Sequence, residues 1–172
     1  MAASALRKKK ILLYSVYGLV ALVVFLLQYS AFATVPLGRG TVSFFLPVVF
    51  SAAVLFREWA GAFYGLVCGF AMDMVSGEAI GFHAIALFTI CLFAGYMISH
   101  FLRKQFLSSA LVLVGCTVVF YPAKWFCLWL LPGREEAALY LIRVTLPSMT
   151  ATALISLPIY WLLRAMARKL VQ

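Results

Sequence analysis

The sequence predicts an all-α integral membrane protein whose chain crosses a bilayer about six times. Its 172 residues are 66% hydrophobic and only 11% charged, and their mean hydropathy is +1.06. A soluble domain carries about 25% charged residues, so this chain lacks the polar side chains that cover a water-exposed surface. A membrane helix uses about 20 apolar residues, and six such helices leave only tails and short loops. We therefore expect a single polytopic membrane domain over residues 1–172.

The expected spans follow one another with short connections. In chain order they cover residues 11–34, 41–56, 59–75, 80–101, 106–131 and 137–163. The second span is short and contains Pro47, so a re-entrant or strongly tilted segment is the alternative to a full crossing. The sixth contains Pro147 and Pro158, where we expect kinks, because neighbouring groups in a membrane protein satisfy the carbonyls that proline leaves without a donor.

The basic residues indicate the orientation of the chain. If the N-terminus is cytoplasmic, only Arg39 and Arg134 fall in the outer loops. Ten basic residues then fall on the inner side: Arg7, Lys8, Lys9, Lys10, Arg57, Arg103, Lys104, Arg164, Arg168 and Lys169. This positive-inside bias predicts that both termini are cytoplasmic. The net charge of +9 requires no nucleic-acid partner, since topology and attraction to anionic membrane lipid account for it.

Sequence patterns for catalysis and metal binding are absent. The chain has no H-E-x-x-H, no G-x-S-x-G and no phosphate-binding glycine loop. Its four cysteines have no metal-ligand spacing. His83 and His100 lie near opposite ends of the fourth span, too far apart to share a site, and we expect His83 at the membrane interface. We therefore expect no enzymatic activity, no metal and no cofactor.

A row of small residues marks the third span. Gly61, Gly65 and Gly69 recur every four residues, which on a helix leaves a bare groove that drifts by about 40° per step. Membrane helices associate through close backbone packing, and glycine grooves permit it. We expect this helix to pack tightly against another one, either within the chain or on a partner.

Asp73 continues the same row at the outer end of the third span, and Ser76, Gly77 and Gly81 form the expected turn into the fourth. A carboxylate in a membrane helix usually faces protein or a water-filled cavity, because exposure to lipid is costly. Lys124 and Arg143 are expected at a similar depth, and we consider them possible charge partners of Asp73. The alternative is that each side chain extends to the outer head groups.

These residues resemble a known family. The basic N-terminus, Leu46-Pro47, Phe56-Arg57-Glu58 and the run Gly65-x-x-x-Gly69-x-x-x-Asp73-x-x-Ser76-Gly77-x-x-x-Gly81 look like the rod shape-determining protein MreD. The resemblance implies a non-enzymatic protein of the bacterial cytoplasmic membrane that takes part in cell elongation, peptidoglycan synthesis and the regulation of cell shape. The partners it implies are MreC, the glycosyltransferase RodA, a class B penicillin-binding transpeptidase and, indirectly, the MreB filament.

The family is also similar in fold to the substrate-binding subunits of energy-coupling-factor vitamin transporters. A transporter subunit is therefore the alternative function. Such subunits tend to carry an Ala-x-x-x-Ala-like face on the first span, and residues 14–23 show no such row. The expected outer loops are also short for closing over a vitamin. We therefore favour the membrane scaffold.

Overall fold

The computed structural model describes residues 2–30, 36–37, 40–56, 58–77, 81–101, 106–133 and 137–171. Within these residues the regular secondary structure is helical except for one short pair of strands, β1 (Pro36–Leu37) and β2 (Gly40–Thr41). The helices are α1 (Ala2–Tyr29), α2 (Phe45–Leu55), α3 (Glu58–Ser76), α4 (Phe82–His100), α5 (Phe106–Trp125), α6 (Ala137–Tyr140) and α7 (Leu146–Val171). Two π-helical segments, η1 (Phe126–Leu130) and η2 (Leu141–Thr145), extend α5 and join α6 to α7. The predicted all-α class is confirmed.

Five helical stretches of the described chain are long and apolar enough to cross a membrane. They are Ile11–Tyr29, Glu58–Ser76, Phe82–His100, Leu107–Leu130 and Ala137–Lys169, and they correspond to the first, third, fourth, fifth and sixth expected spans. Residues 31–35, at the end of the first expected span, lie outside the described residues. The last stretch continues beyond the expected limit at 163.

The structure does not confirm the second expected span, residues 41–56, as a membrane-crossing helix. Only its 11-residue part α2 is helical, which at about 1.5 Å per residue rises about 17 Å, roughly half of a hydrocarbon core about 30 Å thick. Ten of the eleven residues of α2 are buried. The apolar character of residues 45–55 therefore reflects burial among other helices rather than contact with lipid. Pro47 lies in the first turn of α2, where an α-helix needs no N–H donor, so it introduces no kink.

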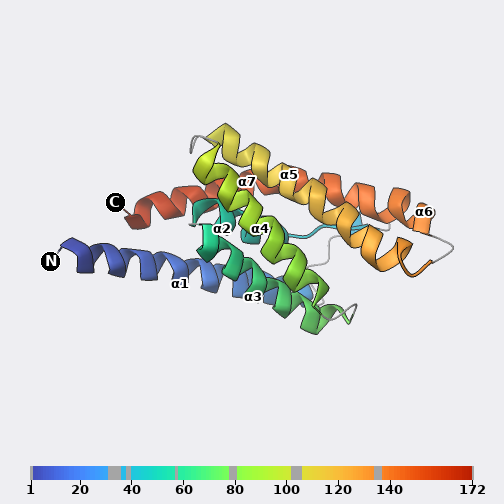
Figure 1. Ribbon diagram of the computed structural model, residues 1–172, viewed down its shortest axis with the longest axis horizontal. Helices are drawn as coiled ribbons and strands as arrows, with labels where there is room; N and C mark the ends of the chain where they lie inside the picture. The colour runs from blue at the N-terminus through green and yellow to red at the C-terminus, as the bar shows by residue number, and fades with distance from the viewer. Residues whose placement is uncertain are drawn as a thin grey trace.

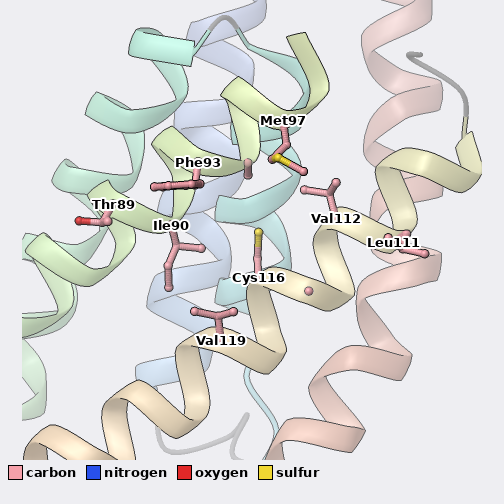
Figure 2. A pocket seen from close by; sticks show the side chains of 10 residues that line it. Thr89, Ile90, Phe93, Met97, Leu111, Val112, Cys116 and Val119 are labelled. Carbon is pink, nitrogen blue, oxygen red and sulfur yellow. The ribbon is translucent and has the colours of Figure 1, made fainter. Parts of the chain in front are cut away.

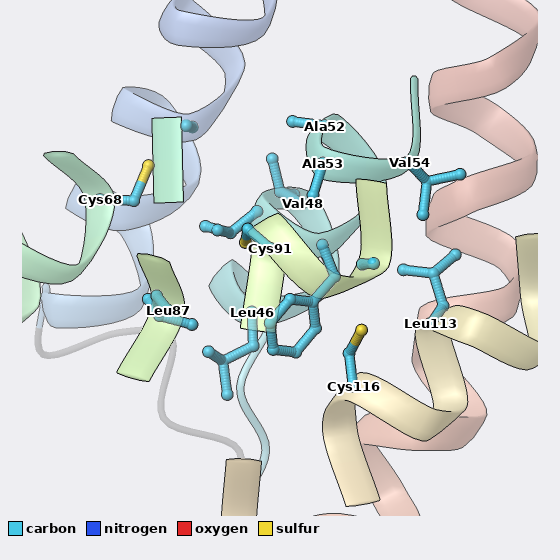
Figure 3. Packing of buried hydrophobic residues seen from close by; sticks show 14 of the residues in the cluster. Leu46, Val48, Ala52, Ala53, Val54, Cys68, Leu87, Cys91, Leu113 and Cys116 are labelled. Atoms are coloured by element: carbon cyan, nitrogen blue, oxygen red, sulfur yellow. The ribbon is translucent and has the colours of Figure 1, made fainter. Parts of the chain in front are cut away.

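The core of the protein surrounds α2 (Figure 3). Leu46, Val48 and Ala53 of α2 pack with side chains from α3, α4 and α5, including the buried Cys91 and Leu113. The three buried cysteines belong to this cluster and act there as small apolar side chains.

Two tyrosine hydroxyls connect the peripheral helix α1 to the rest of the bundle. Tyr17 donates a hydrogen bond to the Leu163 carbonyl of α7 at 2.9 Å, and Tyr64 of α3 donates one to the Tyr17 carbonyl at 2.9 Å. Tyr17 is 1% exposed, and buried hydroxyls with partners of this kind fix the relative position of the helices. The start of α1 and the end of α7 lie at the same end of the bundle, and α6 lies at the opposite end (Figure 1).

Candidate functional site

The glycine row of α3 faces neighbouring helices of the same chain. A Cβ atom on Gly61 would lie 2.9 Å from Cα of Ala53 in α2. One on Gly65 would lie 2.8 Å from Sγ of Cys91 in α4, and one on Gly69 would lie 2.6 Å from Cα of Ala84. Distances below about 3 Å leave no room for a side chain, so α3 and α4 meet through their backbones. Among the described residues, no other pair of helices is in more extensive contact.

The helix α4 contributes a glycine that sequence reasoning did not single out. A Cβ atom on Gly95 would lie 2.9 Å from Cα of Glu58 at the start of α3. Gly95 follows Leu87 and Cys91 at intervals of four residues, and all three are buried. That spacing on one helix face is the signal that could have identified it.

Gly77 and Gly81 have a different role from the rest of the row. Their φ angles are +61° and +90°, and a Cβ atom on either would meet no other atom within 4 Å. Left-handed backbone of this kind strains residues that carry a side chain. These two glycines therefore shape the connection between α3 and α4, whereas Gly61, Gly65 and Gly69 permit close helix packing.

Asp73 caps the N-terminus of α4 from the neighbouring helix. Its Oδ1 accepts the backbone N–H of His83 at 3.0 Å, and its Oδ2 accepts that of Ala84 at 3.0 Å. The N-cap residue of α4 is Gly81, which has no side chain that could accept these hydrogen bonds. A carboxylate at this place satisfies backbone donors and interacts favourably with the positive end of the helix dipole.

The Asp73 carboxylate also contacts the imidazole ring of His83. Nδ1 of the ring lies 2.8 Å from Oδ1, and the two side chains are 0% and 1% exposed for His83 and Asp73. A carboxylate only accepts hydrogen bonds, so Nδ1 carries the proton. His83 is thus fully buried inside the protein, and its depth at the membrane interface stays a prediction. The last turn of α3 thus meets the first turn of α4 through these contacts.

Lys124 and Arg143, the possible charge partners, are not among the described hydrogen bonds of Asp73. Lys124 is half-buried on α5 and lines a separate small cavity, and Arg143 is exposed on η2. Their pairing with Asp73 stays a prediction. The contacts that the structure gives to Asp73 all come from α4.

A second carboxylate–imidazole pair lies at the other end of the hairpin. Oε1 of Glu58 lies 3.2 Å from Nε2 of His100, with side chains that are 28% and 54% exposed. Exposed pairs of this kind contribute about 0–1 kcal/mol to stability. The buried pair at Asp73 therefore fixes the hairpin much more firmly than the pair at Glu58.

The Asp73–His83 pair has a structural role in holding α3 against α4. A carboxylate–imidazole pair also occurs in hydrolytic triads, but there the ring faces a cleft that admits substrate. The His83 ring is sealed inside the helix bundle. Among the described residues, no group of three or more His, Cys, Asp or Glu side chains could hold a metal ion.

An apolar groove lies on the surface between α4 and α5 (Figure 2). Its volume is about 390 Å³, and Phe93 and Met97 of α4 and Val112 and Val119 of α5 are among the residues that line it. Gly115 also lines it, and a Cβ atom there would meet nothing within 4 Å. The glycine in this groove therefore has no neighbouring helix against it, whereas the glycines of α3 are in close contact with their neighbours.

Five described helical stretches are long and apolar enough to cross a membrane, and a glycine row and a buried Asp–His cap hold α3 against α4. These features define a polytopic helical membrane protein. The family model of the rod shape-determining protein MreD matches residues 8–170. The chain belongs to the MreD family, as the motif around residues 65–81 indicated. Comparison with curated proteins and with solved structures gave no match. The similarity in fold to transporter subunits therefore stays a prediction.

Proposed function

We propose that this protein is a non-enzymatic component of the bacterial cell-elongation machinery that binds MreC and supports peptidoglycan synthesis and the regulation of cell shape. The observation that carries the proposal is the family match over residues 8–170, which covers nearly the whole chain. The sealed contact between α3 and α4 supports a scaffold, because it forms a firm body and leaves the buried polar groups out of reach of a substrate.

The same proposal includes the wider set of partners and the location. RodA and a class B penicillin-binding transpeptidase are the partners for wall synthesis, and the MreB filament is an indirect one. The protein lies in the cytoplasmic membrane with both termini in the cytoplasm, as the distribution of basic residues favours. Membrane lipid surrounds it, and nucleic acid is no partner.

The groove between α4 and α5 is the surface that we propose for a membrane helix of MreC. Membrane helices associate where small residues let their backbones approach, and Gly115 offers such a place within an apolar recess.

The test combines cell shape with co-purification. Depletion of the protein in its host should abolish rod shape, and the unaltered chain should restore it and co-purify with MreC. Gly115→Leu places a side chain in the groove, at a position where a Cβ atom would meet nothing within 4 Å. We expect it to reduce the amount of MreC recovered at least fivefold. Gly18→Leu is the matched control, because Gly18 lies on α1 beside a different cavity and its Cβ atom would also meet nothing within 4 Å.

The possible outcomes distinguish a failure of the proposed docking surface from a failure of the proposed function. Equal recovery of MreC with both variants would show that the groove is not the docking surface. Normal cell shape after depletion would contradict the proposed function itself. The transporter subunit would instead be favoured if depletion left cell shape unaffected and the purified protein retained a bound small molecule.

A further inference from the structure

One arm of the chain forms the end of the bundle that is opposite to the termini. We call it the distal arm and define it as the described residues 126–133 and 137–145, which include η1, α6 and η2. Along the long axis of the molecule this arm extends farther than α3 and α4 do (Figure 1). The two helical stretches that carry it have 24 and 33 residues, whereas α3 and α4 have 19 each. The distal arm therefore projects from the packed part of the protein.

Few side chains of the distal arm are buried. The segment η1 has no buried residue, α6 has Ala137 and η2 has Thr145. In α2, by contrast, ten of the eleven residues are buried. Segments with few buried contacts change their conformation at a low cost in free energy. Packing therefore constrains the distal arm much less than it constrains the core around α2.

The two sides of the distal arm are nevertheless fastened to each other. The rings of Trp129 and Tyr140 stack with centroids 3.7 Å apart and an interplanar angle of 16°. The indole N–H of Trp125, the last residue of α5, donates a hydrogen bond to the Ala137 carbonyl at 2.8 Å. Aromatic stacking and a hydrogen-bonded indole fix the geometry of the groups that they join. We therefore expect the arm to move as one piece.

Both connections of the distal arm to the bundle combine a π-helical segment with a proline. The hydrogen bonds of these segments span five residues, as between the N–H of Leu131 and the carbonyl of Phe126 at 2.9 Å. Pro122 lies four residues before η1, and Pro147 lies two residues after η2. Proline lacks the N–H that a helix needs, and prolines and π-bulges are the usual places where helices bend. Their coincidence on both connections forms a double hinge.

A cavity of about 70 Å³ lies between the distal arm and the rest of the bundle. Its lining includes Tyr140 and Val144 from the arm, and Tyr121 and Ser148 from α5 and α7. Protein interiors are normally close-packed, whereas side chains leave this volume unfilled. The cavity gives the side chains at the base of the arm room to shift when the angle of the arm changes.

We propose that the distal arm is a hinged element, which changes its angle to the bundle at Pro122 with η1 and at η2 with Pro147. The rest of the bundle stays fixed, because α3 and α4 meet through their backbones and Asp73 caps α4. The hinge allows the arm to follow a partner bound at this end of the protein without opening the core. This device goes beyond the proposed scaffold function and does not depend on it.

The test measures distances between two nitroxide labels in the full-length chain in lipid nanodiscs. One pair joins Met74→Cys on α3 to Leu131→Cys in the arm, and the control pair joins Met74→Cys to Val118→Cys, which precedes the hinge on α5. All three positions are exposed, and Cys127→Ser removes the one cysteine that is not buried. Leu131 lies about 9 Å beyond Trp125 along the helix, so a bend of about 20° moves it by about 3 Å. The distance distribution of the Leu131 pair should be broader than that of the control pair by this amount.

Two further measurements make the test specific. Replacing the Met74 label by one at Leu154→Cys on α7 detects a movement in another direction, since Leu154 is exposed on a different helix. Combining Pro122→Ala with Pro147→Ala restores the missing N–H groups, and we expect it to narrow the Leu131 distribution to the width of the control pair. Pro158→Ala is the matched control, because Pro158 lies in the α-helical part of α7 away from η2. It should leave the width unchanged.

Three results would overturn the proposal. The first is an equal width for the Leu131 and Val118 pairs with both reference labels, which would show a rigid arm. The second is an unchanged Leu131 distribution in the protein that carries both Pro122→Ala and Pro147→Ala. The third is an equal narrowing by Pro158→Ala, which would assign the motion to the whole of α7. The first comparison retains all native prolines, so it decides the question even if the double proline variant does not fold.

Discussion

Asp73 and His83 are joined by two hydrogen bonds, one from the backbone N–H of His83 at 3.0 Å and one from its ring Nδ1 at 2.8 Å. The second carboxylate oxygen accepts the N–H of Ala84. One side chain of α3 thus satisfies two backbone donors and one ring donor of α4. Because these groups are buried, removing the carboxylate leaves several donors without an acceptor. We expect this loss to lower the stability of the folded protein.

Asp73→Asn should destabilise the protein by about 1–2 kcal/mol, and Asp73→Leu by about 2–4 kcal/mol. Asparagine keeps one acceptor and turns a donor toward N–H groups, whereas leucine removes every acceptor. The free energy of unfolding in mild detergent measures both effects. Glu58→Gln is the control, since it breaks the partly exposed pair with His100 and should cost at most about 0.5 kcal/mol. Equal losses for Asp73→Asn and Glu58→Gln would show that the buried cap has no special weight.

Gly69→Ala should destabilise the protein by about 1–3 kcal/mol, although alanine is the better helix former. The added Cβ atom would lie 2.6 Å from Cα of Ala84, so α3 and α4 must separate. Gly115→Ala is the matched control, because its Cβ atom would meet nothing within 4 Å. It should be neutral or stabilise the helix by up to about 1 kcal/mol. Thermal unfolding of the two variants side by side is the measurement, and a loss of the same size in both would contradict the packing argument.

The sequence alone predicts the class of the protein and the packing role of the glycine row, because both depend on local patterns. A composition that cannot cover a soluble surface identifies a membrane protein, and a spacing of four identifies the packed face of α3. The sequence alone could not predict the length of α2. The sequence pattern of an apolar run such as residues 45–55 is the same whether the helix faces lipid or is buried inside the protein. Only the packing of the surrounding helices shows which of the two environments it has.

The partners of Asp73 depended on tertiary structure in the same way. Lys124 and Arg143 were considered because opposite charge is visible in a sequence, whereas a backbone N–H carries no sequence signature. His83 is ten residues from Asp73, and the pair forms only because the turn at Gly77 and Gly81 reverses the chain. The π-helical segments η1 and η2 were not predicted either, because no local sequence pattern indicates them.

Gly81→Ala should cost about 1–2 kcal/mol of stability, because the φ angle of +90° places an added side chain in the left-handed region. The position has no steric obstacle within 4 Å, so the cost comes from the backbone alone. Gly77→Asn should cost less than Gly77→Ala, since asparagine tolerates a φ angle near +61° better. Unfolding in detergent provides the comparison. Identical stabilities for the asparagine and alanine variants at position 77 would argue against this explanation.

The last prediction concerns topology: both termini face the cytoplasm and Gly133 faces the opposite side. Five long helices alone would place the ends of the chain on opposite sides of the membrane. The start of α1 and the end of α7 nevertheless lie at one end of the bundle (Figure 1). We therefore predict that the chain crosses the membrane once more between the end of α1 and the start of α3. The excess of Lys and Arg on the side of the termini predicts that this end is cytoplasmic.

Reporter fusions at Gln172 and at Gly133 test this arrangement directly. A reporter that is active only in the cytoplasm should work at Gln172, and one that is active only outside should work at Gly133, which is exposed between η1 and α6. Because α2 is too short to cross the core as a helix, a third fusion at the N-terminus is the decisive control. It should report the same compartment as Gln172 if residues 31–55 complete a crossing. Opposite compartments for the two termini would instead mean that α2 and the segment before it enter the membrane and leave on the same side.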